Sequence, residues 1–201
     1  METRSTSRSR GSLVTCAFVL LLGTAGCSGS SGNDGLGSSS GGASGGAGLT
    51  DDQIVGIVNT ANSGEIAQAR LAESITQNAD VQNIAMMMAT MHGQLNAQLT
   101  SVSQKDDLPP ATSAIEQMLA SGGQQTMAML QGLTGSSFDL AYVDANVQAH
   151  QGAMQLFQTQ LIPDATNPDL KAFLQNMLPV VQAHLQAWTA LQAKLGDGGS
   201  P

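Results

Sequence analysis

The 201-residue sequence contains only two cysteines, seven basic residues and three histidines. Cys16 lies within a leader-like segment, so Cys27 is the one cysteine that a processed chain would keep. A single cysteine excludes an intramolecular disulfide and CxxC redox or zinc chemistry. Removing residues 1–26 takes away three of the seven basic and one of the fifteen acidic residues, which leaves a net charge of about −10. This deficit of Lys and Arg argues against binding to nucleic acid or to anionic lipid by charge.

Residues 1–26 are predicted to be a lipoprotein signal peptide. Three arginines precede an apolar run over residues 13–22, which is too short to span a bilayer permanently. The segment Thr24-Ala-Gly-Cys27 resembles a bacterial lipobox, although Thr24 stands where that motif usually has an aliphatic residue. We therefore expect lipidation of Cys27 and a membrane anchor, with ordinary cleavage and an unmodified Cys27 as the alternative. By resemblance to bacterial sorting rules, Ser28 favours an exported protein on the outer membrane that faces the periplasm.

The rest of the chain divides by composition. Residues 27–49 contain the cysteine and a Gly/Ser-rich stretch that cannot bury enough surface to fold, so we expect a flexible linker. Residues 50–196 suit one domain, and residues 197–201 are expected to be a disordered tail. No β pattern is present in the sequence. Four amphipathic segments predict an all-α, four-helix bundle, with a broken helical crossover from Ser113 through a gap at Gly122-Gly123 to Leu130. The expected helix starts are a capping box of Thr50 and Gln53, then Asp80, Ser136-Ser137 and Asn167. The first helix has an expected weak point at Ser63-Gly64, and turns are expected near Ala79 and Asp164.

Each of the four main helices carries one polar residue on or beside its apolar stripe. Ile54, Val58, Ala61, Glu65, Ala72 and Ile75 fall near the first stripe. The second is Val81, Ala85, Met88, His92, Leu95, Leu99 and Val102. The third is Leu140, Val143, Val147, His150, Met154, Phe157 and Leu161. The last is Leu170, Leu174, Met177, Val181, His184, Trp188, Leu191 and Leu195.

These four polar residues are the candidate site. Counting residues from the expected turns places Glu65, His92 and His150 at one depth, whereas His184 overshoots by one to one and a half helical turns. Imidazoles and a carboxylate that converge from several helices form a plausible site for a divalent metal such as Fe, Zn, Mn or Cu. The alternative is a buried polar layer that fixes which helices pair. Asp139 and Tyr142 could support the site from a second shell.

Two more specific kinds of metal site, a di-iron centre and a Cu(I) site, can be compared with the sequence. Paired Glu-x-x-His repeats are absent, because Ala89, Val147 and Val181 precede the histidines by three, so a standard di-iron centre is not expected. A methionine group beside His92 suggests a soft Cu(I) site, but core packing accounts for it as well. That group consists of Met86, Met87, Met88 and Met91.

Several segments resemble domain-of-unknown-function family 4142 in the same order. They are Glu65-Ile66, His92-Gly-Gln-Leu95, Leu108-Pro109, Gly135-Ser-Ser-Phe-Asp-Leu-Ala-Tyr142, His150-Gln151, Leu178-Pro179 and His184-Leu185. The resemblance implies a ferritin-like bundle and a bacterial envelope protein, often a lipoprotein, but no reaction. The chain departs from the family where an Asp often precedes the second-helix histidine, since Met91 stands there. The missing carboxylate weakens a metal site that would use it.

Two functions remain from the sequence. The first is a membrane-tethered binding or structural module without catalysis, with an envelope protein as a possible partner. The second is a metal-binding protein that protects against metal or oxidative stress through Glu65, His92, His150 and His184. A metal-dependent oxidoreductase is a narrower version of the second. The sequence leaves enzymatic activity, the metal and the oligomeric state open.

Overall fold

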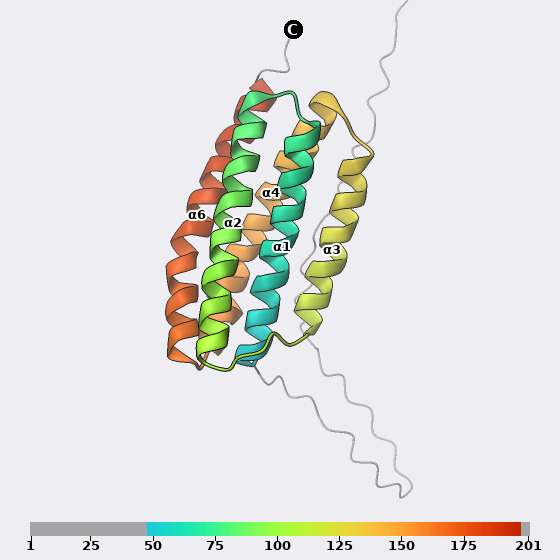
Figure 1. Ribbon diagram of the computed structural model, residues 1–201. Helices are drawn as coiled ribbons and strands as arrows, with labels where there is room; N and C mark the ends of the chain where they lie inside the picture. The colour runs from blue at the N-terminus through green and yellow to red at the C-terminus, as the bar shows by residue number, and fades with distance from the viewer. Residues whose placement is uncertain (1–47, 198–201) are drawn as a thin grey trace, which may run out of the picture. The chain divides into compact units, whose positions relative to one another are not determined.

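The structure is a computed structural model that describes residues 48–197. Its helices are α1 (Asp51–Ile75), α2 (Ala79–Lys105), α3 (Ala114–Gln131), α4 (Gly135–Leu156), a π-helical turn η1 (Phe157–Leu161), α5 (Ile162–Asp164) and α6 (Pro168–Asp197) (Figure 1). The predicted signal peptide, Cys27, most of the linker and nearly all of the tail lie outside the described residues. Within residues 48–197 there is no strand. The all-α prediction is confirmed.

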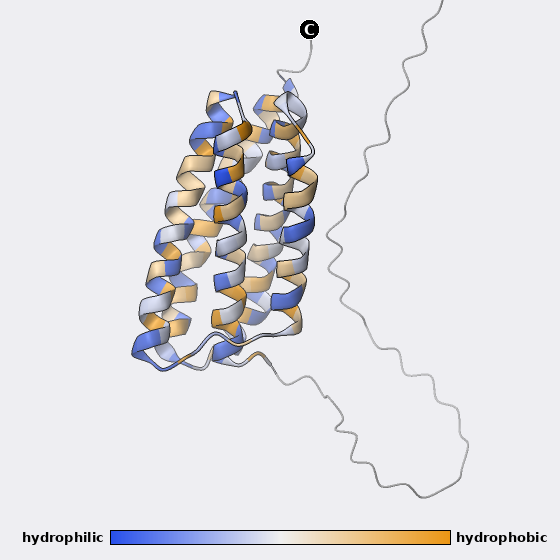
Figure 2. Ribbon diagram, turned by 45° about the vertical axis from the view of Figure 1, so that its right-hand side comes forward, coloured by the Kyte–Doolittle hydropathy of each residue, from blue (hydrophilic) through white to orange (hydrophobic). Residues whose placement is uncertain are grey.

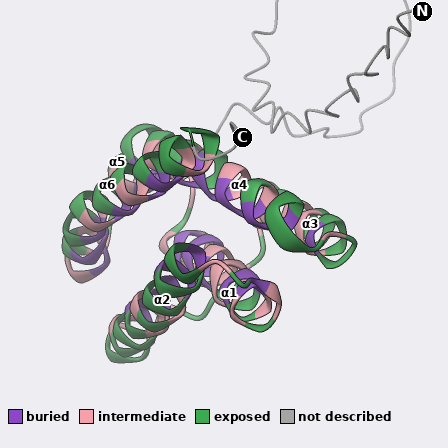
Figure 3. Ribbon diagram, turned by 90° about the horizontal axis from the view of Figure 1, so that it is seen from above, coloured by how far each residue is buried: buried purple, intermediate pink, exposed green. Residues whose placement is uncertain are grey.

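Two antiparallel hairpins build the bundle. In the view along the helices, α1 and α2 pair on one side and face α4 and α6 on the other (Figure 3). The connection α3 runs beside α1 and returns the chain to the end from which α4 starts, so it is the predicted crossover between the second and third main helices (Figure 1). Hydrophobic and hydrophilic residues alternate along every helix, as amphipathic packing requires (Figure 2).

Local signals set most helix starts. Thr50 and Gln53 form the predicted capping box at the start of α1. Asn167 accepts hydrogen bonds from the first backbone amides of α6, as predicted. Two starts were placed too late: Asn78 rather than Asp80 caps α2, and Thr134 rather than Ser136-Ser137 precedes α4. In both cases a second polar residue inside the first turn imitated a cap.

Glycine does not interrupt the helices. We expected a weak point at Ser63-Gly64 and a gap at Gly122-Gly123, yet α1 and α3 run through both positions. Glycine reduces helix propensity by only about 1 kcal/mol, and burial of the apolar face of α1 outweighs that loss. The crossover is therefore one continuous helix. The last helix also continues through Pro179, which lies on its exposed surface.

The core consists of two apolar clusters. One holds Val58, Leu95, Phe157 and Val181 among others. The other includes residues from the same helices at the opposite end of the bundle; it holds Ala69, Met88, Val147 and Trp188 among others. On α2, α4 and α6 the histidine lies between a residue of the first cluster and a residue of the second. The three histidines thus form a buried polar layer that divides the core.

One predicted stripe is rotated. Leu140 on α4 keeps 41% of its surface exposed, whereas Phe138, Tyr142 and Asn146 are buried. The buried face of α4 therefore lies between two rows of residues and not along the row that includes Leu140. These rows are Phe138, Tyr142, Asn146 and His150, and Asp139, Val143 and Val147. This rotation brings Asn146, one helical turn before His150, into the core.

Among residues 48–197, no helix is both long enough and apolar enough to cross a membrane.

Candidate metal centre

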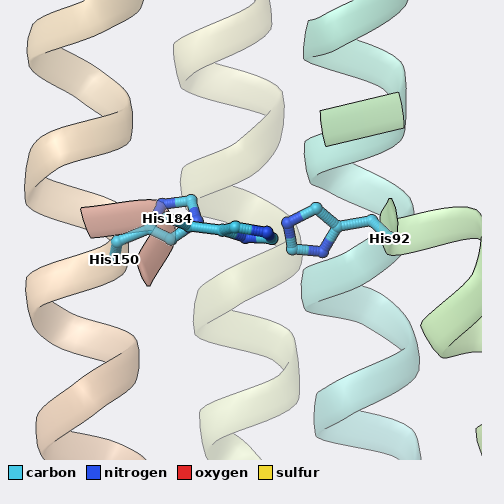
Figure 4. A group of neighbouring side chains, drawn as sticks. All are labelled: His92, His150 and His184. Atoms are coloured by element: carbon cyan, nitrogen blue, oxygen red, sulfur yellow. The ribbon is translucent and has the colours of Figure 1, made fainter. Parts of the chain in front are cut away.

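His92 from α2, His150 from α4 and His184 from α6 meet between the helices (Figure 4). All three are buried, and their ring centroids lie 5.3 to 6.0 Å apart. One nitrogen of each ring lies within 4.8 Å of one nitrogen of each of the others. The structure thus places His92 and His150 at one depth, as counted from the sequence, and it places His184 with them, where an overshoot of one to one and a half helical turns was expected.

The outer nitrogen of His92 is held by an amide. Asn62 Nδ2 donates to Asn96 Oδ1 at 2.8 Å, which leaves Asn62 Oδ1 as an acceptor 2.9 Å from His92 Nδ1. His92 Nδ1 therefore carries the proton and donates it to Asn62. As a result, His92 Nε2 has a lone pair. Asn62 is itself buried on α1, so this ring orientation is fixed by two helices.

The other two rings are oriented in the same manner. His150 Nδ1 lies 2.9 Å from the backbone carbonyl oxygen of Asn146, which only accepts, so Nδ1 is protonated and Nε2 has the lone pair. His184 Nε2 lies 3.3 Å from Met91 Sδ, a weak acceptor. When Nε2 of His184 donates to this sulfur, the lone pair is on Nδ1. Metal-binding histidines in proteins are held by such hydrogen bonds from their second nitrogen.

The remaining nitrogen of each ring has no hydrogen-bond partner among the described residues. These atoms are His92 Nε2, His150 Nε2 and His184 Nδ1, and each is buried. Three lone pairs in one buried layer repel one another, and a buried acceptor without a donor is unfavourable by about 1–3 kcal/mol. A cation that accepts lone pairs removes both problems. The geometry therefore provides a donor set that suits a metal ion.

Burial keeps the three imidazoles neutral. It lowers the pKa of His92 to about 3, with a further contribution from the charges of His184 and His150. The pKa of His150 falls to about 4 through burial, against the opposing effect of its hydrogen bond to Asn146. Burial and the charge of His150 lower the pKa of His184 to about 4. At neutral pH no proton competes for the lone pairs.

The spacing suits a transition metal after a small contraction. Three nitrogens at the outer limit of 4.8 Å surround a point about 2.8 Å from each. Imidazole–metal bonds are about 2.0–2.1 Å long, so each ring would move by less than about 0.8 Å. Three neutral imidazoles leave one coordination position open. Zinc, copper and iron all accept such a set, whereas Mg and Ca prefer oxygen ligands.

Glu65 is not part of the cluster formed by the histidines. The helix bounds explain why. Counted from the last residue of α1 and the first of α2, Asn62 and His92 are both 13 residues from the hairpin turn, so they share one depth. The sequence count had centred that turn near Ala79 and so selected Glu65, one helical turn away. Asn62 follows Val58 by four residues, so the same spacing rule could have found it.

Glu65 instead lies one helical turn after Asn62 on α1, toward the apolar cluster that includes Ala69 and Trp188. Although the residue keeps part of its surface exposed, burial of its carboxyl group raises its pKa to about 7. Burial raises the pKa of Tyr142, and the charge of Glu65 raises it further. Tyr142 packs on Trp188 and stacks on Phe138. Asp139 accepts a hydrogen bond from Thr76 Oγ1 at 2.5 Å. Neither Asp139 nor Tyr142 hydrogen-bonds to the three imidazoles in the described residues.

The position of His184 also follows from the observed turn. Counted from Asp164, His184 is 20 residues away and His150 is 14, which produced the expected overshoot. Helix α6 starts at Pro168, however, and the three residues before it form a loop that adds little length along the bundle. Counted from the helix start, His184 is 16 residues up. The mismatch shrinks to two residues, about 3 Å.

Comparisons with known proteins agree with this fold. The crystal structure of a DUF305 protein from Streptomyces coelicolor, described as secreted, is similar with a TM-score of 0.60 and 14% identity; the match covers 73% of this chain and 94% of that one. This similarity concerns the fold alone. No curated protein matches the chain. The family model of DUF4142, a domain of unknown function, matches residues 37–191. The chain is therefore a member of the DUF4142 family.

Proposed function

We propose that this protein binds one transition-metal ion at His92, His150 and His184. The observation that supports the proposal is the arrangement of nitrogens. Three buried ring nitrogens face one layer without hydrogen-bond partners, while the second nitrogen of each ring contacts an acceptor. Neutral, pre-oriented imidazoles are the form of histidine that metals bind. Glu65 is not included in this site.

The proposal includes a location. Export, lipidation of Cys27 and anchoring to the outer membrane are supported by the basic start, the short apolar run and the lipobox-like end of residues 1–27. The similar DUF305 protein is described as secreted, in agreement with an exported chain. A tethered, acidic domain with a buried metal would act as a metal-binding protein at the envelope surface, with a role against metal or oxidative stress.

A structural polar layer is the second candidate function, and one observation favours it. The hydrogen bonds of His92 to Asn62, and of Asn62 to Asn96, join α1 to α2 within the core. Buried polar groups of this kind specify which helices pair. In that case the protein is a binding or structural module that needs no metal. It would meet an envelope protein partner through its surface.

Metal content separates the two candidates. The purified protein is exposed in turn to Zn, Fe, Mn and Cu, and elemental mass spectrometry then measures the bound metal. His150→Ala removes one ligand, and Gln148→Ala, an exposed position on the same helix, is the matched control. Circular dichroism shows that each variant is folded. We expect about one ion per chain in the parent and the control and little in His150→Ala. Absence of metal from all three proteins would leave the structural layer.

A further inference from the structure

A groove between α2 and α6 leads toward the histidine layer. It encloses about 180 Å³, and Leu95, Phe173 and Met177 are buried along it. Exposed amide side chains, Gln94, Gln98 and Asn176, line it on the solvent side. No charged residue lines this groove. The two helices are joined beyond it by Lys105–Asp169 at one end of the bundle and Lys194–Asp80 at the other.

Met91 lines the end of the groove nearest the histidines. It is half-buried, it belongs to the groove lining, and its sulfur also contacts His184 Nε2 at 3.3 Å. Val180, one turn before His184 on α6, lies at the same end. A cation moving inward along the groove would therefore meet the Met91 thioether immediately before the first imidazole.

The separation of these two atoms suits two ligands of one ion. For a metal–sulfur bond of about 2.3 Å and a metal–nitrogen bond of about 2.0 Å, tetrahedral geometry places sulfur and nitrogen about 3.5 Å apart. The observed distance between Met91 Sδ and His184 Nε2 is 3.3 Å. Binding of one ion by both atoms requires the other tautomer of His184, with its proton on Nδ1. In that tautomer Nε2 replaces Nδ1 as the ligand atom of His184, and the Met91 sulfur binds the ion instead of accepting a hydrogen bond.

The chemistry of the groove favours a soft, singly charged ion. A thioether selects Cu(I) over harder cations, and imidazole also binds it. The groove offers a second thioether, Met177, and no carboxylate that would attract a hard divalent ion. The neighbouring methionines have other positions: Met86 and Met87 keep 46% and 39% of their surface exposed, and Met88 is packed in the core.

We propose that the α2–α6 groove is the access route to the histidine centre, and that Met91 at its inner end is the thioether ligand that makes the centre selective for Cu(I). This inference rests on the proposed metal-binding function.

The test compares Cu(I) with Zn(II) in the purified protein. Cu(I) is supplied anaerobically with ascorbate as its bicinchoninate complex, and Zn(II) is measured by competition with a chromophoric chelator. Met91→Leu keeps the volume of the side chain and removes the sulfur. Met87→Leu, one turn earlier on the exposed surface, is the matched control. We expect Met91→Leu to weaken Cu(I) binding by on the order of tenfold or more, with Zn(II) binding and the Met87→Leu control unchanged.

A second variant tests the route. Asn176→Trp places a large ring at the exposed rim of the groove, and we expect slower loading of Cu(I) with the same affinity at equilibrium. An equal loss of Cu(I) and Zn(II) affinity in Met91→Leu would overturn the selectivity, since the sulfur would then only orient His184. Unchanged Cu(I) affinity in that variant, or an unchanged loading rate in Asn176→Trp, would also overturn the proposal. Loss of both metals in His150→Ala shows separately that the histidine centre exists; unchanged binding there would remove the proposed function itself.

Discussion

Acidification should destabilise the metal-free protein through its histidine layer. The chain contains three histidines, and all three lie in this layer, so histidine-linked pH dependence reports on the site alone. Their folded pKa values of about 3 to 4 are below the ordinary value of 6.5. The unfolded chain therefore binds more protons between about pH 4 and pH 6.5. The stability that the neutral histidines contribute is fully present above pH 6.5 and is lost as the pH falls toward their folded pKa values.

The size of the effect follows from the shifts. Between about pH 7.5 and pH 5, each buried histidine removes about 2 kcal/mol of unfolding free energy, because one pKa unit corresponds to about 1.4 kcal/mol. Three histidines remove about 6 kcal/mol. Glu65 acts in the opposite direction: its folded pKa of about 7 lies above the ordinary 4.5, so the folded state gains protons first as the pH falls. This gain returns about 2–3 kcal/mol, and the net loss is about 3–4 kcal/mol.

Urea denaturation in the presence of a metal chelator measures this loss at several pH values. Glu65→Gln should enlarge the fall between pH 7.5 and pH 5 to about 6 kcal/mol, since the opposing group is removed. His150→Gln should reduce the fall by about 2 kcal/mol. The slope against pH is compared rather than the stability itself, so a constant packing defect cancels. A parent protein whose stability rises by about 2–3 kcal/mol between pH 7.5 and pH 5, as Glu65 alone would cause, would show that the imidazoles titrate normally, and the buried arrangement of lone pairs would be wrong.

Three further predictions follow from single contacts. Gly56→Ala should lower stability by about 1–3 kcal/mol or more, because its Cβ would lie 2.2 Å from the Ala111 carbonyl oxygen. Gly64→Ala, with open space around it on the same helix, should raise stability by about 0.5–1 kcal/mol. Equal effects of the two variants in thermal melts would contradict the packing of α1. Glu65→Gln should raise the unfolding free energy at about pH 8.5 by about 3 kcal/mol and leave it unchanged near pH 4, which denaturant titrations check. Asn62→Ala should weaken metal binding about 10–100-fold in chelator competition, since it releases the outer nitrogen of the nearest imidazole; full affinity would show that this hydrogen bond does not orient the ring.

The sequence predicted the architecture because each main helix repeats its apolar residues over several turns. A stripe of six or more positions averages out local errors, so the single deviation at Leu140 did not alter the four-helix assignment. Helix ends depended on one or two residues each. Consequently the starts of α2 and α4 were misplaced by a few residues, and glycines inside α1 and α3 were given too much weight.

The same difference between long stripes and short local signals explains which site residues the sequence predicted. Three histidines on the stripes of three helices had to face one core. Helix lengths gave the common depth of His92 and His150, whereas His184 was expected one to one and a half helical turns too far along. The fourth member could not be chosen in this way. Asn62 and Glu65 are three residues apart, so they differ by about 4.5 Å in depth and by about 60° in direction. An error of two residues in the α1–α2 turn is enough to exchange them. The contact of Met91 with His184 joins two helices that are not consecutive, and no local pattern encodes it.

The polar layer makes opposite contributions to the metal-free and metal-bound states. Without an ion, three buried lone pairs interrupt a core that otherwise consists of two apolar clusters, and apolar side chains at these positions would remove that penalty. With an ion, the same atoms become ligands that need no deprotonation and little movement. A layer that served only to pair helices would gain from having its inner nitrogens hydrogen-bonded as well. Only the outer nitrogen of each ring is hydrogen-bonded, and the inner nitrogen has no hydrogen-bond partner among the described residues. A binding site requires this arrangement and a structural layer does not.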